Sequence, residues 1–431
     1  MTLPENQNFK PELPKFLKRI AEDIREAGGK SFLVGGWVRD TLIGNDCRDY
    51  DVEVYHMPEE TLLKILSRYG KPNLVGKAFG VILLSVKGVT YDFSFPRTES
   101  KVGKGHRGFI VNTHQDISFR EAAARRDFTI NAMGMELPHL ELCDPYRGRE
   151  DLQNRILRHV SAAFVEDSLR VLRGVQFASR FELTLAEETA ALCRTLSLED
   201  LSKERLFEEF KKWMLKPGKL SMGLKAFREM ELGKFFPEIR PLNNSWENLG
   251  KSLDYLSKST AELPESSRTI LLFTMLLFGA ENKEKILLFL ERLTNESELL
   301  QKVPLLWELS RKVILQGEEN DWNFNPEFLR RESLVLSGFS LVTEFLKALP
   351  SPDFAASEKK ADRLRESAEK SEVLYQALES FIGGKDLMAL GVKPGKVFGE
   401  IIRECLELQI TGALTTREQA LQWLKTRLTS I

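Results

Sequence analysis

One stretch, SFLVGGWVRDTLIGNDCRDYDVEVY at residues 31–55, constrains the fold more than any other part of the chain. Its apolar start predicts a short strand, which turns at Gly35 and Gly36 into a helix ending at Gly44. DYDVEVY then alternates strictly between polar and apolar residues, as a half-buried strand does. A glycine turn before a helix lets backbone N–H groups approach phosphate oxygens. The same turn also occurs as plain turn chemistry.

The carboxylates of this strand indicate a metal site. Asp49 and Asp51 are two residues apart, so their side chains point to one face of a strand, and Glu53 continues that face. Adjacent carboxylates repel each other unless a cation lies between them, and Mg²⁺ prefers a few carboxylates with water and phosphate oxygens. In two-metal nucleotidyl transfer one ion activates the attacking hydroxyl and the other holds the triphosphate. The alternative is a solvent-facing strand with an acidic edge.

A third carboxylate follows on a predicted hairpin. GVILLSVKG and VTYDFSFPR are two strands joined by a glycine-containing turn, and Asp92 lies on the second strand. We predict that Asp92 faces the pair and contributes to catalysis. The other interpretation is an ordinary exposed strand aspartate, because one sequence does not fix strand register.

A second polar group lies in RRDFTINAMG. Asp127 and Asn131 are four residues apart and share a face if the segment is helical. Arg125 and Arg126 can bind phosphates with two hydrogen bonds each, while Asp and Asn can bind ribose hydroxyls. The alternative is a capped, solvated helix end.

The segment FVEDSLRVLRGVQFASRF carries a pattern suited to reading a base. On one helix, Glu166, Asp167 and Arg170 would crowd one side. An Arg beside an Asp presents donors next to an acceptor, which complements the Watson–Crick edges of cytosine and adenine. Guanine and uracil present a ring N–H that clashes with the arginine. The alternative is an intrahelical salt bridge, which contributes only about 0.3–0.5 kcal/mol.

The character of the chain changes near residue 164, where strand signals give way to helical periodicity. We therefore predict an α+β head followed by an all-helical remainder. The expected domains are a head at 1–150, a neck at 151–230, a body at 231–348 and a tail at 349–431. Within the head, the polar, basic and glycine-bearing residues 98–118 are expected to form a mobile loop.

Composition excludes several protein classes. The 431 residues carry a formal net charge of −1, so nucleic acid would have to bind a local basic patch. Four cysteines without CxxC spacing argue against structural zinc and fit a reduced, cytoplasmic location. No apolar run is long enough to span a membrane, so no membrane partner is expected.

Taken in order, several motifs resemble the class II tRNA nucleotidyltransferase (CCA-adding enzyme) and bacterial poly(A) polymerase family. They are LVGGWVRDTLIGNDCRDYDVEVY, FPRTE, RRDFTINAMG, DPYRGREDLQNRILRHV and EDSLRVLRGVQFASRF. The resemblance implies a polymerase-β-like nucleotidyltransferase head with a mixed sheet, followed by a helical neck, body and tail. It implies these roles: Asp49 and Asp51 for metal; Gly35, Gly36, Arg39 and Asp40 for the triphosphate; Asp127 and Asn131 for ribose; Arg125 and Arg126 beside the incoming nucleotide; Glu166, Asp167 and Arg170, with Arg173 nearby, as the nucleotide template.

The resemblance also implies the reaction. The expected enzyme adds CCA to tRNA 3′ ends from CTP and ATP with two Mg²⁺ ions, contacting the acceptor stem and elbow of tRNA and not DNA. Addition of A alone and poly(A) synthesis remain open. Two other classes are a non-catalytic RNA-binding protein on the same scaffold and a small-molecule nucleotidyltransferase. Intact Asp49 and Asp51 argue against the first, and EDSLR with a long helical body argues against the second.

The helical remainder yields two further predictions. The tail-like stretch from residue 381 places Lys385, Lys393 and Lys396 where they would face RNA phosphates, although surface solubility explains them equally well. Some relatives carry an HD phosphohydrolase domain in the body. No histidine lies beyond His159 here, so a His-Asp metal site cannot form and we predict no phosphohydrolase activity.

Overall fold

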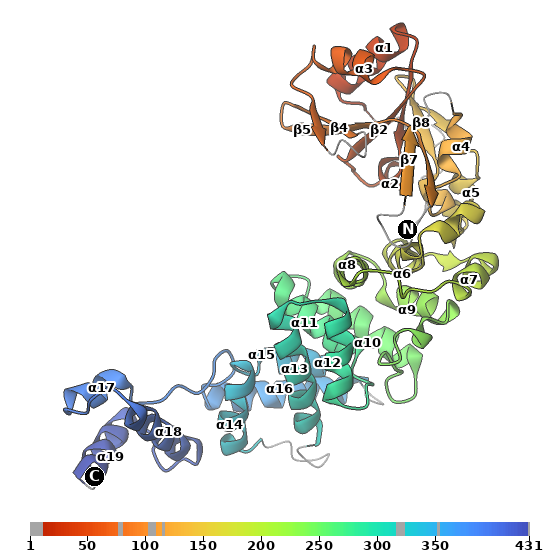
Figure 1. The fold of residues 1–431 in the computed structure, drawn as a ribbon. Coiled ribbons are helices and arrows are strands. Elements are labelled where there is room, and N and C mark those ends of the chain that lie inside the picture. The colour runs from red at the N-terminus through yellow and green to blue at the C-terminus, as the bar shows by residue number, and fades with distance from the viewer. Residues whose placement is uncertain are drawn as a thin grey trace. The chain divides into compact units, whose positions relative to one another are not determined.

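The structure is a computed structural model that describes residues 12–75, 81–101, 109–113, 117–315, 324–350 and 354–429. The chain forms two compact units, Met1–Phe235 and Phe236–Ile431 (Figure 1). Each unit is described by itself. The first contains the sheet and the predicted site, and the second consists of helices in its described residues.

A seven-stranded mixed sheet forms the centre of the head, in the order β3-β4-β5-β2-β1-β8-β9. The strands are β1 Lys30–Val34, β2 Tyr50–Tyr55, β3 Asn73–Val75, β4 Val81–Val86, β5 Val89–Ser94, β8 Gly134–Leu137 and β9 Glu141–Cys143. The β2–β5 pair is parallel and the other pairs are antiparallel. The predicted hairpin is therefore confirmed as β4–β5, and the fold class as α+β with a mixed sheet.

The sheet's core comes from the apolar positions of the alternating strands. Leu33, Val52, Val54, Leu84 and Phe93 have no exposed surface. Helices α1 (Lys15–Glu26) and α3 (Glu59–Leu66) pack against each other, and α1 also packs on β1 (Figure 1). The apolar stripe of α1 is fully buried while its charged residues remain at the surface. This packing holds β1 in place. The glycine turn follows β1 directly, and β2 comes after the short helix α2 (Gly36–Leu42).

Part of the predicted loop at residues 98–118 is a β-hairpin instead. Strands β6 (Arg97–Lys101) and β7 (Phe109–Thr113) pair antiparallel as a separate two-stranded sheet. Residues 102–108 and 114–116, which belong to the same prediction, lie outside the described residues. The glycine and lysine residues of the segment favoured a loop prediction, although FIVNT and RTESK contain residues typical of strands.

Several short helices and 3₁₀ turns lie between the longer elements of the first unit or at its end. They are α2 Gly36–Leu42, α4 Phe119–Ala123, α5 Gly148–Gln153 and the 3₁₀ turns η1 Thr129–Asn131, η2 Ala162–Glu166 and η3 Leu232–Lys234. The longer helices are α6 Leu169–Phe181, α7 Glu187–Arg194, α8 Lys203–Leu215 and α9 Leu220–Glu229. Two short strands, β10 (Ile156–Leu157) and β11 (Thr184–Leu185), pair in this otherwise helical region.

Helix α6 is the central element of this region, since it packs against both α8 and α9. Gly174 on α6 faces Phe128 and Met230 at contact distance, which allows the helices to approach closely. Most of α6 is buried, including Val171, Leu172, Val175 and Ala178. Its remaining face carries arginines, so a buried scaffold positions a polar surface.

The second unit is helical throughout the residues described. Its helices are α10 Trp246–Ser259, α11 Glu265–Leu276, α12 Lys283–Leu293, α13 Ser297–Leu315, α14 Pro326–Leu336, α15 Ser340–Lys347, α16 Phe354–Lys370, α17 Gly384–Ala389, α18 Lys396–Ile410 and α19 Arg417–Thr429. In the apolar run at residues 270–280, residues 270–276 belong to α11 and are buried. Residues 354–370, which read as polar, form the amphipathic helix α16, whose Ala361, Leu364 and Ala368 are fully buried.

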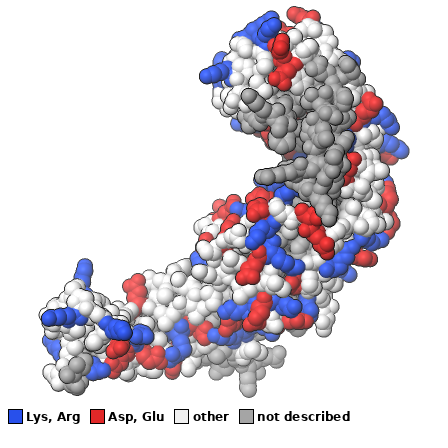
Figure 2. Space-filling view, in the orientation of Figure 1, with Lys and Arg blue, Asp and Glu red and all other residues white. Residues whose placement is uncertain are grey.

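In the part of the chain that the structure describes, no helix is both long enough and apolar enough to cross a bilayer. The visible surface of the second unit mixes basic and acidic side chains (Figure 2). This agrees with the near-zero net charge and places any basic contact surface on a local group of residues.

Candidate active site

A cavity of about 700 Å³ in the first unit brings most of the predicted site residues together. Its lining includes the predicted Gly35, Gly36, Arg39, Asp49, Asp51, Arg125, Arg126, Asp127, Asn131, Asp167, Arg170 and Arg173. It also includes Leu169, Gln176, Phe177, Arg180, Arg205, Lys212 and Lys216, which the sequence did not single out as site residues. Three predicted residues, Asp40, Asp92 and Glu166, lie beside the cavity without lining it.

The carboxylates Asp49, Asp51 and Asp92, here named the acidic edge, lie on neighbouring strands. Asp49 directly precedes β2, and Asp51 lies within it. Parallel pairing of β2 with β5 places the Asp92 Cα opposite the Asp51 Cα. Within the described residues, no hydrogen bond or ion pair reaches the carboxylates of these three residues. The register that the sequence could not fix therefore brings Asp92 next to the pair.

The acidic edge is electrostatically unsatisfied. Although Asp51 keeps contact with solvent, partial burial and then the charges of Asp49 and Asp92 raise its pKa to about 6. Partial burial and the Asp49 charge also raise the pKa of Asp92. Like charges held this close favour the protonated form unless a cation neutralises them. The edge therefore has the charge and the oxygen donors that a divalent cation requires.

The carboxylate count fits Mg²⁺ bound partly by its substrate. Among the described residues, no group of three or more His, Cys, Asp or Glu side chains is close enough to hold a metal. Two carboxylates from Asp49 and Asp51 match the usual protein share of a Mg²⁺ shell, in which water and phosphate oxygens complete the coordination. A ligand role for Asp92 stays a prediction.

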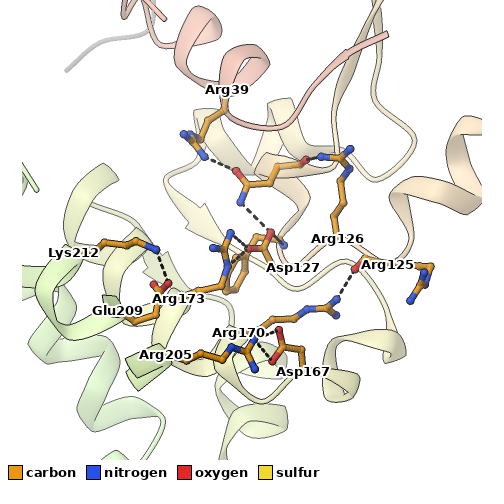
Figure 3. A network of polar contacts seen from close by, with 12 residues as sticks. Arg39, Arg125, Arg126, Asp127, Asp167, Arg170, Arg173, Arg205, Glu209 and Lys212 are labelled. Atoms are coloured by element: carbon orange, nitrogen blue, oxygen red, sulfur yellow. Dashed lines mark hydrogen bonds and ion pairs between the residues drawn. The ribbon is translucent and has the colours of Figure 1, made fainter. Parts of the chain in front are cut away.

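The cavity is also lined by an arginine network, formed by Arg39, Arg125, Arg126, Arg170, Arg173, Arg180 and Arg205. All of these except Arg180 are labelled in Figure 3. Each of these side chains has a partner. Arg39 donates to Asn131 Oδ1 at 2.5 Å, and Asn131 donates to Asp127 Oδ1 at 3.0 Å. Arg173 donates to Asp127 Oδ2 at 2.7 Å through Nε. A continuous chain of contacts therefore links α2, the η1 turn and α6.

Asp127 is the anion at the centre of this chain. Burial alone would raise its pKa, but the Arg173 charge and the donors from Asn131 and the Phe128 N–H outweigh burial, so the pKa lies below its ordinary value. Burial likewise would lower the pKa of Arg173, yet the charge of Asp127 outweighs it and raises that pKa. Both groups stay charged in the buried site. Their ion pair holds both side chains in place at the cavity wall.

The predicted helix through RRDFTINAMG does not form. Helix α4 ends at Ala123, and only Thr129–Asn131 is helical, as a 3₁₀ turn. Asp127 lies in a bend before that turn, Phe128 is extended, and the Asn131 amide donates back to the Asp127 carboxylate. The predicted pairing of Asp127 with Asn131 is thus correct, while the geometry behind it was wrong.

Arg39 and Arg126 anchor the glycine turn. The Arg39 Nη2 lies 2.8 Å from Asp40 Oδ1, and its guanidinium stacks 4.2 Å from the Phe181 ring centroid. Arg126 lies 2.7 Å from Glu53 Oε1. Gly35 adopts φ 67°, and a Cβ there would approach the Arg126 side chain to 3.3 Å. The turn therefore requires glycine for its conformation and keeps its backbone open towards the cavity.

The predicted base-reading residues do not share one helix. Glu166 ends the η2 turn, Asp167 lies between elements, and α6 begins at Leu169. Arg170 donates to the carbonyl oxygens of Arg125, at 2.6 Å, and Ala163, at 2.7 Å. The alternative interpretation, an intrahelical Asp167–Arg170 salt bridge, is not found among the contacts of the described residues.

Asp167 has a different partner. Arg205 on α8 donates to its Oδ1 at 3.1 Å and its Oδ2 at 3.0 Å (Figure 3). Glu166 instead lies 3.4 Å from Arg125 Nη2. Because α6 begins only at Leu169, Glu166 and Asp167 lie outside the helix that carries Arg170. Asp167 points towards α8 instead. Asp167 and Arg170 still line the same cavity, so an acceptor and a donor face one ligand space.

Part of the first unit is similar to a known protein family. Residues 31–158 match the family described as Poly A polymerase head domain. The matched residues contain the glycine turn, the acidic edge and the RRDFTIN segment. The resemblance drawn from the motifs is confirmed for this domain.

One curated relative is the Multifunctional CCA protein of Aromatoleum aromaticum, 39% identical over 214 residues. The match covers 48% of this chain and 50% of the relative. The chain thus spans about half the length of the curated relatives it matches.

Solved structures extend the comparison beyond the head domain. The Thermotoga maritima CCA-adding enzyme in complex with tRNA_CCA has a TM-score of 0.67 at 21% identity, covering 98% of this chain and 97% of that one. The Bacillus stearothermophilus CCA-adding enzyme in complex with CTP has a TM-score of 0.63 at 20% identity, covering 97% and 100%. At this identity the likeness shows the fold, which is therefore confirmed over nearly the whole chain.

Several cavity residues outside the head domain escaped sequence reasoning. Gln176 and Arg180 follow Arg173 at helical spacing on α6, so periodicity could have suggested them. Arg205, Lys212 and Lys216 come from α8 and the residue after it. No local signal connects α8 to the head domain, because only tertiary packing brings it there.

The predicted tail lysines are all exposed. Lys385 lies on α17, Lys393 in the following turn and Lys396 at the start of α18. Within the described residues, no ion pair or hydrogen bond engages their ammonium groups. They are available for contact, and their RNA-binding role stays a prediction.

Proposed function

We propose that this protein is a template-independent RNA nucleotidyltransferase that adds C and A residues to tRNA 3′ ends from CTP and ATP. One observation carries the proposal: a single cavity combines the Asp49–Asp51 pair, the glycine turn and the Asp167–Arg170 surface. These groups match a metal-bound triphosphate at one end and a base edge at the other. The Multifunctional CCA protein relative and the CCA-adding enzyme structures support it.

In the proposed reaction, the 3′-hydroxyl oxygen of the RNA forms a bond to the α-phosphorus of the nucleotide, and pyrophosphate leaves. The glycine turn and Arg39 would hold the triphosphate, while Asp127 and Asn131 would position the ribose. Holding both reactants in line contributes much of the rate in such transfers. The arginine network suits this positioning role because its guanidinium groups are already held by partners before any ligand arrives.

Base selection follows from the donor and acceptor at the other end. Arg170 uses two hydrogen bonds on backbone carbonyl oxygens, and a guanidinium has five N–H donors, so donors remain for a base. Asp167 accepts from Arg205 and has further lone pairs for an exocyclic amino group. The surface therefore favours cytosine and adenine, which combine an amino group with a ring-nitrogen acceptor.

Asp49 and Asp51 are the residues that would hold Mg²⁺, and Asp92 lies beside them. When bound there, Mg²⁺ supplies Lewis acidity towards the attacking hydroxyl and neutralises charge on the leaving pyrophosphate. The protein's own part is to hold the two carboxylates close together, at the cost of mutual repulsion.

The products separate the remaining alternatives. A tRNA transcript ending before CCA, after C, or after CC is incubated with Mg²⁺ and each nucleotide separately, then with CTP and ATP together. Extension of all three to a clean CCA end supports full CCA addition. A single A added only to the CC-ending tRNA identifies an A-adding enzyme. Unlimited A addition to any RNA identifies a poly(A) polymerase, and no extension overturns the proposal.

The tail lysines test the RNA partner separately. Replacement of Lys385, Lys393 and Lys396 by alanine is expected to weaken tRNA binding and to lower the slope of log affinity against log salt by about 1 per lost phosphate contact. CTP affinity in the absence of RNA serves as the control and should not change. An unchanged salt slope would assign these lysines to solubility instead.

A further inference from the structure

Gln176 is a buried polar side chain in the cavity that the reaction outlined above does not use. It lies on α6, is 3% exposed, and lines the cavity. Within the residues that the structure describes, no hydrogen bond reaches its amide. The Gln176 amide is not among the fully enclosed polar atoms without a partner, so it is open to the cavity that the residue lines. An amide that no protein group engages, on an otherwise buried residue at a cavity wall, can hydrogen-bond a ligand there.

The neighbours of Gln176 on α6 are already engaged. Arg173, three residues before it, is bound to Asp127. Arg180, four residues after it, lies 3.5 Å from Asp40 Oδ2. The adjacent Phe177 ring is covered by the guanidinium groups of Arg39 and Arg173. On this face of the helix, Gln176 is thus a neutral group between two paired cations.

The position of Gln176 along α6 indicates which part of a nucleotide it meets. Six residues separate it from Arg170, which is about 9 Å along a helix axis. Arg173 contacts Asp127, the proposed ribose residue, and Arg180 contacts Asp40 on the helix that follows the glycine turn. Gln176 therefore lies past the ribose end of the cavity, towards the triphosphate end.

We propose that the Gln176 side-chain amide donates a hydrogen bond to a phosphate oxygen of the incoming CTP or ATP. The inference rests on the proposed function, since it needs a nucleotide bound with its base at Asp167 and Arg170. A neutral donor contacts the phosphate without adding positive charge. It therefore helps to place the triphosphate without increasing the electrostatic attraction that opposes pyrophosphate release. Gln176 is on this account a residue that binds and positions the substrate.

The test compares CTP with CMP by equilibrium binding to the full chain with Mg²⁺ and without RNA. Gln176→Ala is expected to weaken CTP binding about tenfold, as loss of a hydrogen bond to a charged group does. CMP binding should change by no more than about twofold if the contact is to the β- or γ-phosphate, whereas a contact to the α-phosphate weakens both ligands equally. In steady-state extension of tRNA, the KM for CTP should rise more than kcat falls.

Gln176→Glu distinguishes phosphate from ribose recognition, because it keeps an acceptor, loses the donor and adds a negative charge. The proposal expects Gln176→Glu to weaken CTP binding at least as much as Gln176→Ala. If the Gln176 amide oxygen instead accepted a ribose hydroxyl, the Glu variant would retain CTP and CMP affinity. That result would overturn the proposal.

A matched control lies on the same helix. Ser179 is 1% exposed, and its Oγ also lacks a hydrogen-bond partner, but it does not line the cavity. Ser179→Ala should leave CTP affinity unchanged, and equal weakening in both alanine variants would reveal a general packing effect and overturn the inference. If the unsubstituted protein fails to extend tRNA, the proposed function fails. If it extends tRNA and Gln176→Ala binds CTP normally, only this inference fails.

Discussion

The acidic edge and the arginine network face the same cavity but differ in how their charges are satisfied. Every arginine of the network has an acidic, amide or carbonyl partner. The three carboxylates of the acidic edge have none among the described residues, and burial with mutual repulsion raises the pKa values of Asp51 and Asp92. One side is satisfied within the protein and the other is not, and on the proposed function a cation would complete it.

This difference separates two ways of building a site. The network contributes to stability and holds its geometry without a ligand, as a preorganised binding surface does. The carboxylates of the acidic edge repel one another in the metal-free protein and, on the proposed function, act only when a cation is bound. Substitutions at the acidic edge should therefore reduce activity far more than stability. Substitutions in the arginine network should reduce stability more.

The largest effect is expected at the acidic edge. Asp49→Ala should reduce nucleotide incorporation by about a thousandfold or more, because a lost metal site removes several kcal/mol of transition-state stabilisation. Its thermal unfolding midpoint should stay level or rise, since repulsion is relieved. Asp46→Asn is the matched control, because Asp46 pairs with Arg48 at the exposed surface of the same loop. Full incorporation by Asp49→Ala would remove the metal assignment.

Asp127→Asn tests the contribution of the arginine network to stability. It removes the buried anion that Arg173 requires, and we expect the free energy of unfolding to fall by about 2–3 kcal/mol. Urea unfolding at neutral pH measures this loss, with Asp49→Asn as the reference. Equal stability of the Asp127→Asn variant and the unsubstituted protein would contradict a preorganised arginine network.

Arg170→Ala should change base choice more than chemistry. Loss of its donors should reduce the preference for CTP and ATP over UTP and GTP by about tenfold, in line with 1–3 kcal/mol for a good base contact. The ratio of kcat/KM values for the four nucleotides measures it. Arg205→Ala, which frees Asp167 without removing a proposed base contact, should change the ratio less. An unchanged preference in Arg170→Ala would exclude the base-reading role.

The smallest effect concerns pH in the absence of metal. The pKa of Asp51 in the folded protein is about 6, above its ordinary value near 4, so the folded state binds more protons between these values. The contribution of Asp51 to stability is therefore fully present below pH 4 and is lost as pH rises through 6. Solvent screening limits it to about 1 kcal/mol or less. Asp51→Asn should flatten this slope in unfolding experiments between pH 5 and 7, and an unchanged slope would contradict it.

The sequence predicted local elements of the site better than their assembly. The glycine turn, the alternating strand with Asp51 and the β4–β5 hairpin are encoded by short-range patterns and were correct. The position of Asp92 depended on parallel pairing of β2 with β5, a long-range contact. Local periodicity carries no information about such pairing.

The same limit explains the errors. The EDSLR segment has helical spacing, but η2 ends at Glu166 and α6 begins only at Leu169, so Asp167 turns to Arg205 of α8. The RRDFTIN segment leaves the helix because Asp127 is drawn into contacts with Arg173 and Asn131. In both places tertiary partners for a charged side chain override local helix propensity.

The most direct test of the difference between the two sides is thermal unfolding with CTP alone and with CTP plus Mg²⁺. Two proteins are compared, the unsubstituted chain and the Asp49→Asn, Asp51→Asn double variant. CTP alone should raise the midpoint of both, since the arginine network is intact in each. Addition of Mg²⁺ should raise the midpoint further only in the unsubstituted chain. An equal further rise in the double variant would show that the acidic edge does not hold the cation, and would contradict the account.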